Sequence, residues 1–297
     1  MASSSSPFDC LIFDLDDTLY SSKIGIGEAT RRNIEDFLVE KCGFAKSNAS
    51  TLRSELLRTY GGTLAGLRAL GYDVDADDYH SFVHGRLPYD LIKPDARLRG
   101  LLRSINQRKI IFTNSDGIHA MKVLDRLGIK DFFEQIICFE TMNPSLTKSS
   151  TPDEFPIVLK PSLDAMNIAM DVAEVDPRRT LFFDDSVRNV AAGKAVGLQT
   201  ALVGKTMRTK EADYAMEDVH NLVQVIPEIW YKGEDEQRLN RTRSDIESIL
   251  TATPVGAVVS ELLKTKDTAE KASKVALVYD VLNTLKPRGS SKVDLSL

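Results

Sequence analysis

Five short runs of apolar and β-branched residues recur along the chain, and each has the length of a buried β-strand. They cover residues 8–13, 109–113, 135–139, 180–183 and 199–203. Several are almost continuously apolar, as expected when helices cover both faces of a parallel sheet. Between them, apolar residues recur at helical spacing over residues 95–107, 117–127, 162–173 and 187–196. This alternation predicts an α/β fold with a doubly wound, Rossmann-like parallel sheet.

A helical segment interrupts this rhythm between the first and second strands. Its apolar residues follow a helical period over residues 26–38, 52–60, 64–70 and 76–83. A helical insertion directly after the first strand predicts a small cap domain over the edge of the sheet. We therefore divide the chain into a core domain (1–22 and 93–230), a helical cap domain (23–92) and a C-terminal extension (231–297). The extension is expected to be helical and partly disordered.

The composition is that of a soluble globular protein of one or two compact units. The chain has 297 residues, of which 42% are hydrophobic and 27% charged. Its net charge is −5, and it contains no dense tract of Lys and Arg. These values argue against a nucleic-acid polymer or an anionic membrane as the main partner. A small anionic substrate stays open, because the local charge at a site matters more than the total.

The cysteines and the N-terminal residues bear on the compartment. Cys10, Cys42 and Cys138 are odd in number and widely spaced, without a CxxC motif. This argues against a disulfide framework or a zinc site and fits a reducing compartment. Residues 1–7 have neither the apolar core of a signal peptide nor the arginines of a transit peptide. No apolar run approaches the ~20 residues needed to span a bilayer, so we expect a cytoplasmic location.

Two carboxylates follow the first predicted strand. Asp14 and Asp16 are two residues apart, so on extended backbone their side chains point to the same side. They fall at the carboxyl end of a parallel strand, where open α/β sheets place their sites. Their mutual repulsion calls for a cation, and Mg²⁺ prefers oxygen ligands of this kind. One carboxylate can then attack phosphorus while the other acts as acid and base; the alternative is an acidic turn that caps a helix.

Three further fragments with polar chemistry follow later strands. Thr113 and Asn114 end the second strand, where they can hold phosphate oxygens or simply cap the next helix. Lys160 directly precedes a helix that starts with proline, and is either a site cation or a solvated lysine. Asp184 and Asp185 end the strand at 180–183, where they can complete a magnesium site or cap a helix. Each fragment has a plain structural explanation, but their joint order favours one phosphate-binding site.

In content and order, the four fragments resemble the motifs of the haloacid dehalogenase-like superfamily of phosphohydrolases. The resemblance covers residues 8 to about 222. It implies that Asp14 is a nucleophile forming an aspartyl-phosphate, and that Asp16 is first general acid and then general base. It also implies that Thr113, Asn114 and Lys160 hold the phosphate and the nucleophile. Dehalogenases of this fold lack an acid at the position of Asp16, so its presence favours phosphate chemistry.

The resemblance also implies a Mg²⁺ cofactor. The implied ligands are Asp14, the backbone carbonyl of Asp16 and the acidic pair Asp184 and Asp185. Which member of the pair touches the metal directly stays open.

Sequence features of the insertion bear on the substrate. Residues 59–67 and 83–89, followed by Lys93-Pro94-Asp95, resemble the pyrimidine 5′-nucleotidase branch of the superfamily. This resemblance implies a nucleoside 5′-monophosphate such as UMP or CMP. The candidate side chains for reading its base or ribose are Tyr60, His84, Arg86 and Tyr89. The alternatives are a phosphatase for pyridoxal phosphate, a purine nucleotide or a sugar phosphate, and a non-catalytic regulatory protein. The oligomeric state stays open.

Overall fold

A six-stranded parallel sheet forms the centre of the structure, a computed structural model that describes residues 5–146 and 156–231. The strand order is β3-β2-β1-β4-β5-β6, and every neighbouring pair is parallel. The strands are β1 Cys10–Phe13, β2 Arg108–Phe112, β3 Gln135–Ile137, β4 Thr180–Asp184, β5 Gln199–Val203 and β6 Tyr214–Met216. The predicted doubly wound α/β fold is confirmed.

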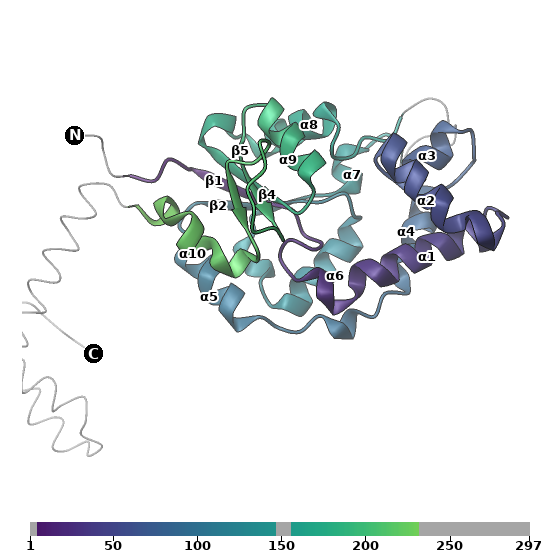
Figure 1. Cartoon of the computed structure of the whole chain (residues 1–297), viewed down its shortest axis with the longest axis horizontal. Helices are drawn as coiled ribbons and strands as arrows, with labels where there is room; N and C mark the ends of the chain where they lie inside the picture. Colours follow the sequence, from purple (N-terminus) through teal and green to yellow (C-terminus); the bar gives the residue numbers. More distant parts are fainter. Residues whose placement is uncertain (1–4, 147–155, 232–297) are drawn as a thin grey trace, which may run out of the picture. The chain divides into compact units, whose positions relative to one another are not determined.

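Helices cover both faces of this sheet, and side-chain alternation along the strands divides the core between the faces. Leu11 and Phe13 face one core, which they share with helices α5 and α6, whereas Cys10 and Ile12 face the other, which they share with α8. Figure 1 shows α5, α6 and α10 on one side of the sheet and α8 and α9 on the other. These helices are α5 Ala96–Ser104, α6 Gly117–Leu127, α8 Leu163–Ala173, α9 Val187–Ala195 and α10 Leu222–Val225. A short helix, α7 Phe139–Met142, follows β3.

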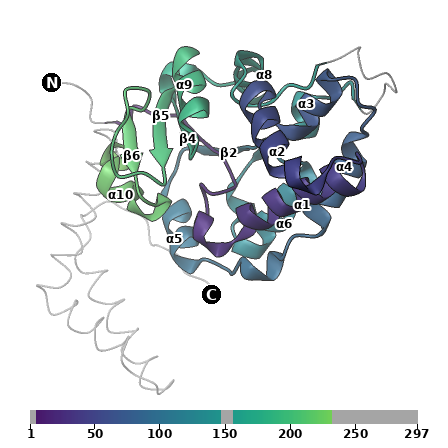
Figure 2. The same cartoon turned by 45° about the vertical axis from the view of Figure 1, so that its right-hand side comes forward.

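Four helices form the segment between β1 and β2, as the insertion predicts. They are α1 Ile26–Glu40, α2 Lys46–Tyr60, α3 Thr63–Ala69 and α4 Ala76–Gly85. They gather beside the sheet, away from α10, in both Figure 1 and Figure 2. Gly66 lets α3 lie close to α2, because a Cβ at this position would sit only 2.6 Å from Leu56 Cδ2. The exact cap boundaries stay a prediction, since residues 6–231 form one compact unit.

The C-terminal extension predicted over residues 231–297 lies almost entirely outside the described residues. Among the helices that the structure does describe, none combines the length and the apolar character needed to cross a membrane.

The register of the sheet brings the predicted site residues to one edge. Phe13 of β1 pairs with Ile111 of β2 and with Phe183 of β4. The residues that follow these strands therefore emerge side by side at the carboxyl ends, under the cap helices. The backbone N–H of Asp14 donates to the carbonyl of Phe183 at 2.8 Å, which fixes Asp14 beside the end of β4.

Candidate active site

A buried lysine joins two of the predicted aspartates. The ammonium group of Lys160 lies 2.7 Å from Asp14 Oδ1 and 2.7 Å from Asp184 Oδ2, and it also donates to the carbonyl of Phe112 at 2.8 Å. Lys160 is only 2% exposed. Burial alone would lower the pKa of Lys160, but the two carboxylates raise it above its ordinary value. The ammonium is therefore charged and holds both aspartates in place.

Asn114 positions Lys160 through its backbone. Its amide Nδ2 donates to the Lys160 carbonyl at 2.9 Å, and its Oδ1 accepts from the Lys160 N–H at 2.8 Å. The side chain was expected to bind substrate, but both of its polar ends are used within the protein. Thr113, at the end of β2, is buried and lines the cavity described below.

The aspartates around Lys160 form a group that could hold a cation. One carboxylate oxygen from each of Asp14, Asp184 and Asp185 lies within 4.8 Å of the others. Burial, opposed by Lys160 and reinforced by the neighbouring carboxylates, raises the pKa of Asp14. Burial and the charges of Asp184 and Asp17 raise the pKa of Asp185 to about 7. Three carboxylates against one ammonium leave excess negative charge, and an all-oxygen donor set fits a hard dication such as Mg²⁺.

The two members of the acidic pair have different surroundings. Asp184 is fully buried, and besides Lys160 it accepts from Asn189 Nδ2 and from the backbone N–H of Ser186. Asp185 lines the cavity. Asp17 also reaches this region, where its Oδ1 is buried without a hydrogen-bond partner among the described residues.

Asp16 is held by three side chains that the sequence did not reveal. Its Oδ1 accepts from the Tyr20 hydroxyl at 2.5 Å and lies 2.8 Å from His119 Nε2, while its Oδ2 accepts from the Ser115 hydroxyl at 2.8 Å. Burial would raise the pKa of Asp16, but His119 and the two hydroxyls hold it well below its ordinary value. Burial likewise favours the neutral His119 ring, yet Asp16 and Asp116 raise the pKa of His119.

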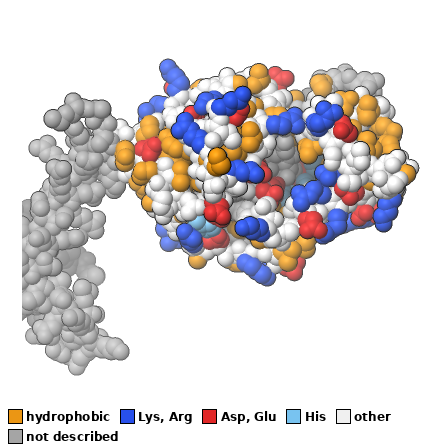
Figure 3. All heavy atoms as spheres, viewed as in Figure 1, with side chains coloured by type: hydrophobic (Ala, Val, Ile, Leu, Met, Phe, Trp, Pro, Cys, Tyr) orange, Lys and Arg blue, Asp and Glu red, His pale blue; other side chains and the backbone are white. Residues whose placement is uncertain are grey.

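These residues surround a cavity of about 310 Å³. The predicted residues that line it are Asp14, Asp16, Thr113, Asn114, Lys160, His84 and Asp185. The cap adds Thr30 and Arg31 from helix α1. On the face that Figure 3 shows, basic and acidic side chains are interspersed.

Three of the four residues predicted to read the base or ribose do not line this cavity: Tyr60, Arg86 and Tyr89. Arg86 stacks its guanidinium 3.6 Å from the centre of the Phe82 ring and pairs with Glu40 at 3.4 Å. Tyr60 ends helix α2 and is 39% exposed. The Tyr89 hydroxyl lies 2.8 Å from Nδ1 of His119, a residue that does line the cavity.

The sequence matches one family of known proteins. A sequence model of the haloacid dehalogenase-like hydrolases matches residues 8–197. Phosphate metabolism protein 8 from Saccharomyces cerevisiae is 27% identical over 195 residues, which are 63% of this chain. The match spans 58% of the length of the yeast protein.

Solved structures share the fold. A haloacid dehalogenase-like phosphatase from Thermococcus onnurineus superposes with a TM-score of 0.50 at 18% identity, over 73% of this chain and 97% of its own. CbbY from Rhodobacter sphaeroides, solved in complex with phosphate, gives a TM-score of 0.50 at 18% identity, over 72% of this chain and 96% of its own. At this identity the likeness bears on the fold alone.

Proposed function

Because the chain belongs to the haloacid dehalogenase-like hydrolases, we propose that it is a Mg²⁺-dependent phosphatase acting on a small phosphate monoester. Its nucleophile is Asp14, which forms an aspartyl-phosphate. The observation that carries this proposal is the pairing of Asp14, bound to a buried ammonium, with a second carboxylate, Asp16, on the same cavity. A dehalogenase needs no acid at the position of Asp16.

In the first step, a carboxylate oxygen of Asp14 attacks phosphorus, and the bond from phosphorus to the leaving oxygen breaks. Lys160 holds Asp14 in place and offsets the charge that gathers on the phosphoryl oxygens. The Thr18 hydroxyl donates to the other oxygen of Asp14 at 3.0 Å and fixes the orientation of the carboxylate.

Asp16 serves both steps as a proton carrier. It protonates the leaving oxygen and then takes a proton from the water that hydrolyses the aspartyl-phosphate. Its ionised form, which His119, Tyr20 and Ser115 stabilise, is the state that the water step requires. The dianionic phosphate entering beside Asp16 raises its pKa by like-charge repulsion, toward the protonated state that the first step requires.

The carboxylate group fits Mg²⁺, which Asp14, Asp185 and the backbone carbonyl of Asp16 would hold. Asp184 is taken up by Lys160 and Asn189, so its role is to orient Lys160 and to supply charge. When bound, Mg²⁺ supplies positive charge that lets an anionic nucleophile meet an anionic phosphate.

Removal of the divalent cation is expected to stop turnover. Dialysis against EDTA leaves Lys160 alone to offset the charge of Asp14, Asp184 and Asp185, and phosphate release should fall to background. Mg²⁺ should restore it, whereas Ca²⁺, which takes more ligands at longer distances, should restore little. Phosphate release is measured by a coupled colorimetric assay. Full turnover in the chelated protein would contradict the proposed metal dependence.

Replacement of His119 by glutamine is expected to lower kcat by about 10²-fold, because the acid–base group Asp16 loses the imidazole that holds it. The pKa of Asp16 should then rise, so the acidic limb of the pH profile of aspartyl-phosphate hydrolysis, the step for which Asp16 must be ionised, should move to higher pH. The matched control is His220→Gln, which removes a histidine paired with Asp218 and Asp95 away from the cavity. Equal pH profiles for His119→Gln and the wild type would refute this role.

The substrate that we propose is a nucleoside 5′-monophosphate, with pyrimidine nucleotides preferred. The cavity volume is at the lower end of the range for small-molecule sites, which favours a compact monoester. The cap side chains placed to meet the leaving group are Thr30, Arg31 and His84. The sequence likeness of residues 59–67 and 83–95 to pyrimidine nucleotidases supports this choice. The second candidate is another small monoester, such as pyridoxal phosphate or a sugar phosphate.

A phosphate-release screen over nucleotides, sugar phosphates and pyridoxal phosphate distinguishes these substrates by kcat/KM. We expect UMP and CMP to give the highest values. A higher kcat/KM for a sugar phosphate would contradict the proposed substrate class but would agree with the proposed phosphatase chemistry. No release from any monoester in the presence of Mg²⁺ would contradict the phosphatase proposal itself.

A further inference from the structure

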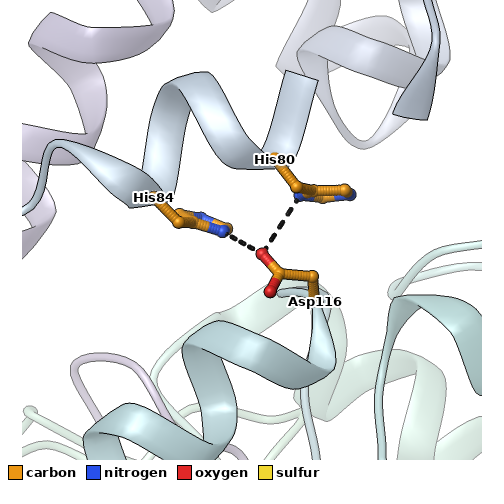
Figure 4. A group of neighbouring side chains, drawn as sticks. All are labelled: His80, His84 and Asp116. Carbon is orange, nitrogen blue, oxygen red and sulfur yellow. Dashed lines mark hydrogen bonds and ion pairs between the residues drawn. The ribbon is translucent and has the colours of Figure 1, made fainter. Parts of the chain in front are cut away.

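Three of the four histidines in the chain gather where cap helix α4 meets core helix α6. His80 and His84 are four residues apart on α4, so their side chains share one face of that helix. They point toward Asp116, the N-cap residue of α6, in Figure 4. His119, one turn along α6, stacks its ring 4.4 Å from that of His84.

The two carboxylate oxygens of Asp116 contact different groups. Oδ1 accepts the backbone N–H of His119 at 2.8 Å and so caps α6. Oδ2 faces both imidazoles: it is hydrogen-bonded to His84 Nδ1 and lies 3.5 Å from His80 Nδ1. One donor atom from each of the three residues lies within 4.8 Å of the others. A tetrahedral metal with bonds of about 2.1 Å places its donors about 3.4 Å apart. The separation of His80 and Asp116 already matches this, whereas the hydrogen-bonded His84 and Asp116 would have to move apart to admit the metal.

The buried ring nitrogens of His80 make no hydrogen bond to any described residue. The His80 side chain is 11% exposed. One face of the ring meets Phe139, with 4.5 Å between ring centroids. Burial lowers the pKa of His80 to about 4, so at neutral pH the ring is uncharged and one nitrogen lone pair is free. A buried imidazole without a partner is unfavourable, and a metal ion would satisfy it.

We propose that His80, His84 and Asp116 form a transition-metal site of the zinc class, which fastens cap helix α4 to core helix α6. Two imidazoles and one carboxylate favour Zn²⁺ over Mg²⁺, and three protein ligands leave a fourth position for water or a small anion. The expectation against a zinc site rested on the cysteines alone. The site is separate from the carboxylate group of Asp14, Asp184 and Asp185 and does not depend on the proposed phosphatase activity.

Occupancy of this site would bear on the cavity through His84, which also lines it. A metal bound there links the cap segment that carries His84 to the core residue Asp116. The expected physical effect is a cap held more firmly against the core, seen as greater resistance to thermal unfolding.

The test titrates Zn²⁺ into the full chain by calorimetry with excess Mg²⁺ present, so that the carboxylate site is already occupied. Co²⁺ serves as a visible-absorption probe of four-coordinate, nitrogen-containing ligation. We expect one Zn²⁺ per chain that Mg²⁺ does not displace, tetrahedral Co²⁺ bands and a raised Tm. His80→Gln should weaken Zn²⁺ binding by at least about tenfold and remove the Co²⁺ bands, because a direct ligand is lost.

Two further variants complete the design. Asp116→Asn keeps an oxygen that can cap α6 but removes the charge, so it should also lose Zn²⁺ while circular dichroism stays unchanged. His220→Gln, which removes a histidine outside the group, should bind Zn²⁺ like the wild type. The proposal is overturned if His80→Gln and the wild type bind Zn²⁺ with equal affinity, or if Mg²⁺ displaces all bound Zn²⁺.

Discussion

The Asp14→Asn variant is expected to lose phosphate release by a factor of at least about 10⁴, because an amide cannot attack phosphorus. The protein itself should remain folded. Asparagine has nearly the same shape, its oxygen can accept from Lys160, and a neutral group is less costly than a carboxylate in this buried position. The turnover number and the Tm are measured on the same preparation. A large fall in kcat with an unchanged or slightly raised Tm is the predicted result.

The same chemical change outside the cavity provides the control. Asp9→Asn removes a carboxylate that pairs with Arg179 on the protein surface. An exposed pair of this kind contributes at most about 1 kcal/mol to stability and has no part in the chemistry. This variant should therefore turn over like the wild type. Wild-type activity in Asp14→Asn would refute the role of Asp14 as nucleophile.

Lys160→Met should damage both activity and stability. The substitution leaves Asp14 and Asp184 buried without their counter-ion, which is expected to lower the free energy of unfolding by about 3–5 kcal/mol. The turnover number should fall by about 10³-fold, because Asp14 loses its positioning contact and the phosphate loses a stabilising charge. Urea denaturation without metal measures the stability loss. Added Mg²⁺ should recover part of it by relieving the same repulsion.

A second buried lysine makes a sharp comparison. Lys109, at the start of β2, donates to the backbone carbonyls of Ile105 and Gln107 and is 9% exposed. Lys109→Met leaves unsatisfied carbonyls but no unpaired carboxylate, so its cost should be about 1–3 kcal/mol with kcat preserved. Equal losses of stability and activity in the two variants would contradict the special role that we assign to the contacts of Lys160 with Asp14 and Asp184.

The sheet could be predicted because parallel strands that are buried on both faces have almost continuously apolar sequences. The five predicted strands all appear, and helix α6 has the predicted bounds. The sixth strand, Tyr214–Met216, has only three residues, two of them half-buried at the sheet edge. So short a segment carries no apolar periodicity, and only pairing with β5 makes it a strand.

The strand-end residues could be predicted for a similar reason. Asp14 and Thr113 directly follow a strand and Asp184 ends one, and parallel strands place such residues at one end of the sheet whatever their spacing in the chain. The side chains that contact Asp16 could not be predicted in this way, because they do not all follow strands of the sheet. His119 is 103 positions away, on a helix whose pattern is satisfied by packing alone.

Side chains on the cap were the least predictable. Tyr60 and Arg86 were candidates because of their sequence context, yet neither lines the cavity: Tyr60 ends α2, and Arg86 directly follows α4. Arg31 and Thr30 line it instead, because α1 follows the loop that carries Asp14 and Asp16. Which residues a cap presents depends on how its helices pack, and local periodicity does not encode this.

The central claim is that Asp14 carries the phosphoryl group during turnover. The protein is quenched in acid during turnover of the best monoester and is then treated with borohydride. Borohydride reduces any acyl phosphate to an alcohol, which peptide mass spectrometry can locate. With a monoester whose leaving group needs no protonation, such as p-nitrophenyl phosphate, Asp16→Asn should slow only the hydrolysis of the intermediate and so raise its yield. We predict reduction at Asp14 alone, dependent on substrate and Mg²⁺. Reduction at another residue, or none under conditions where phosphate is released, would contradict the mechanism.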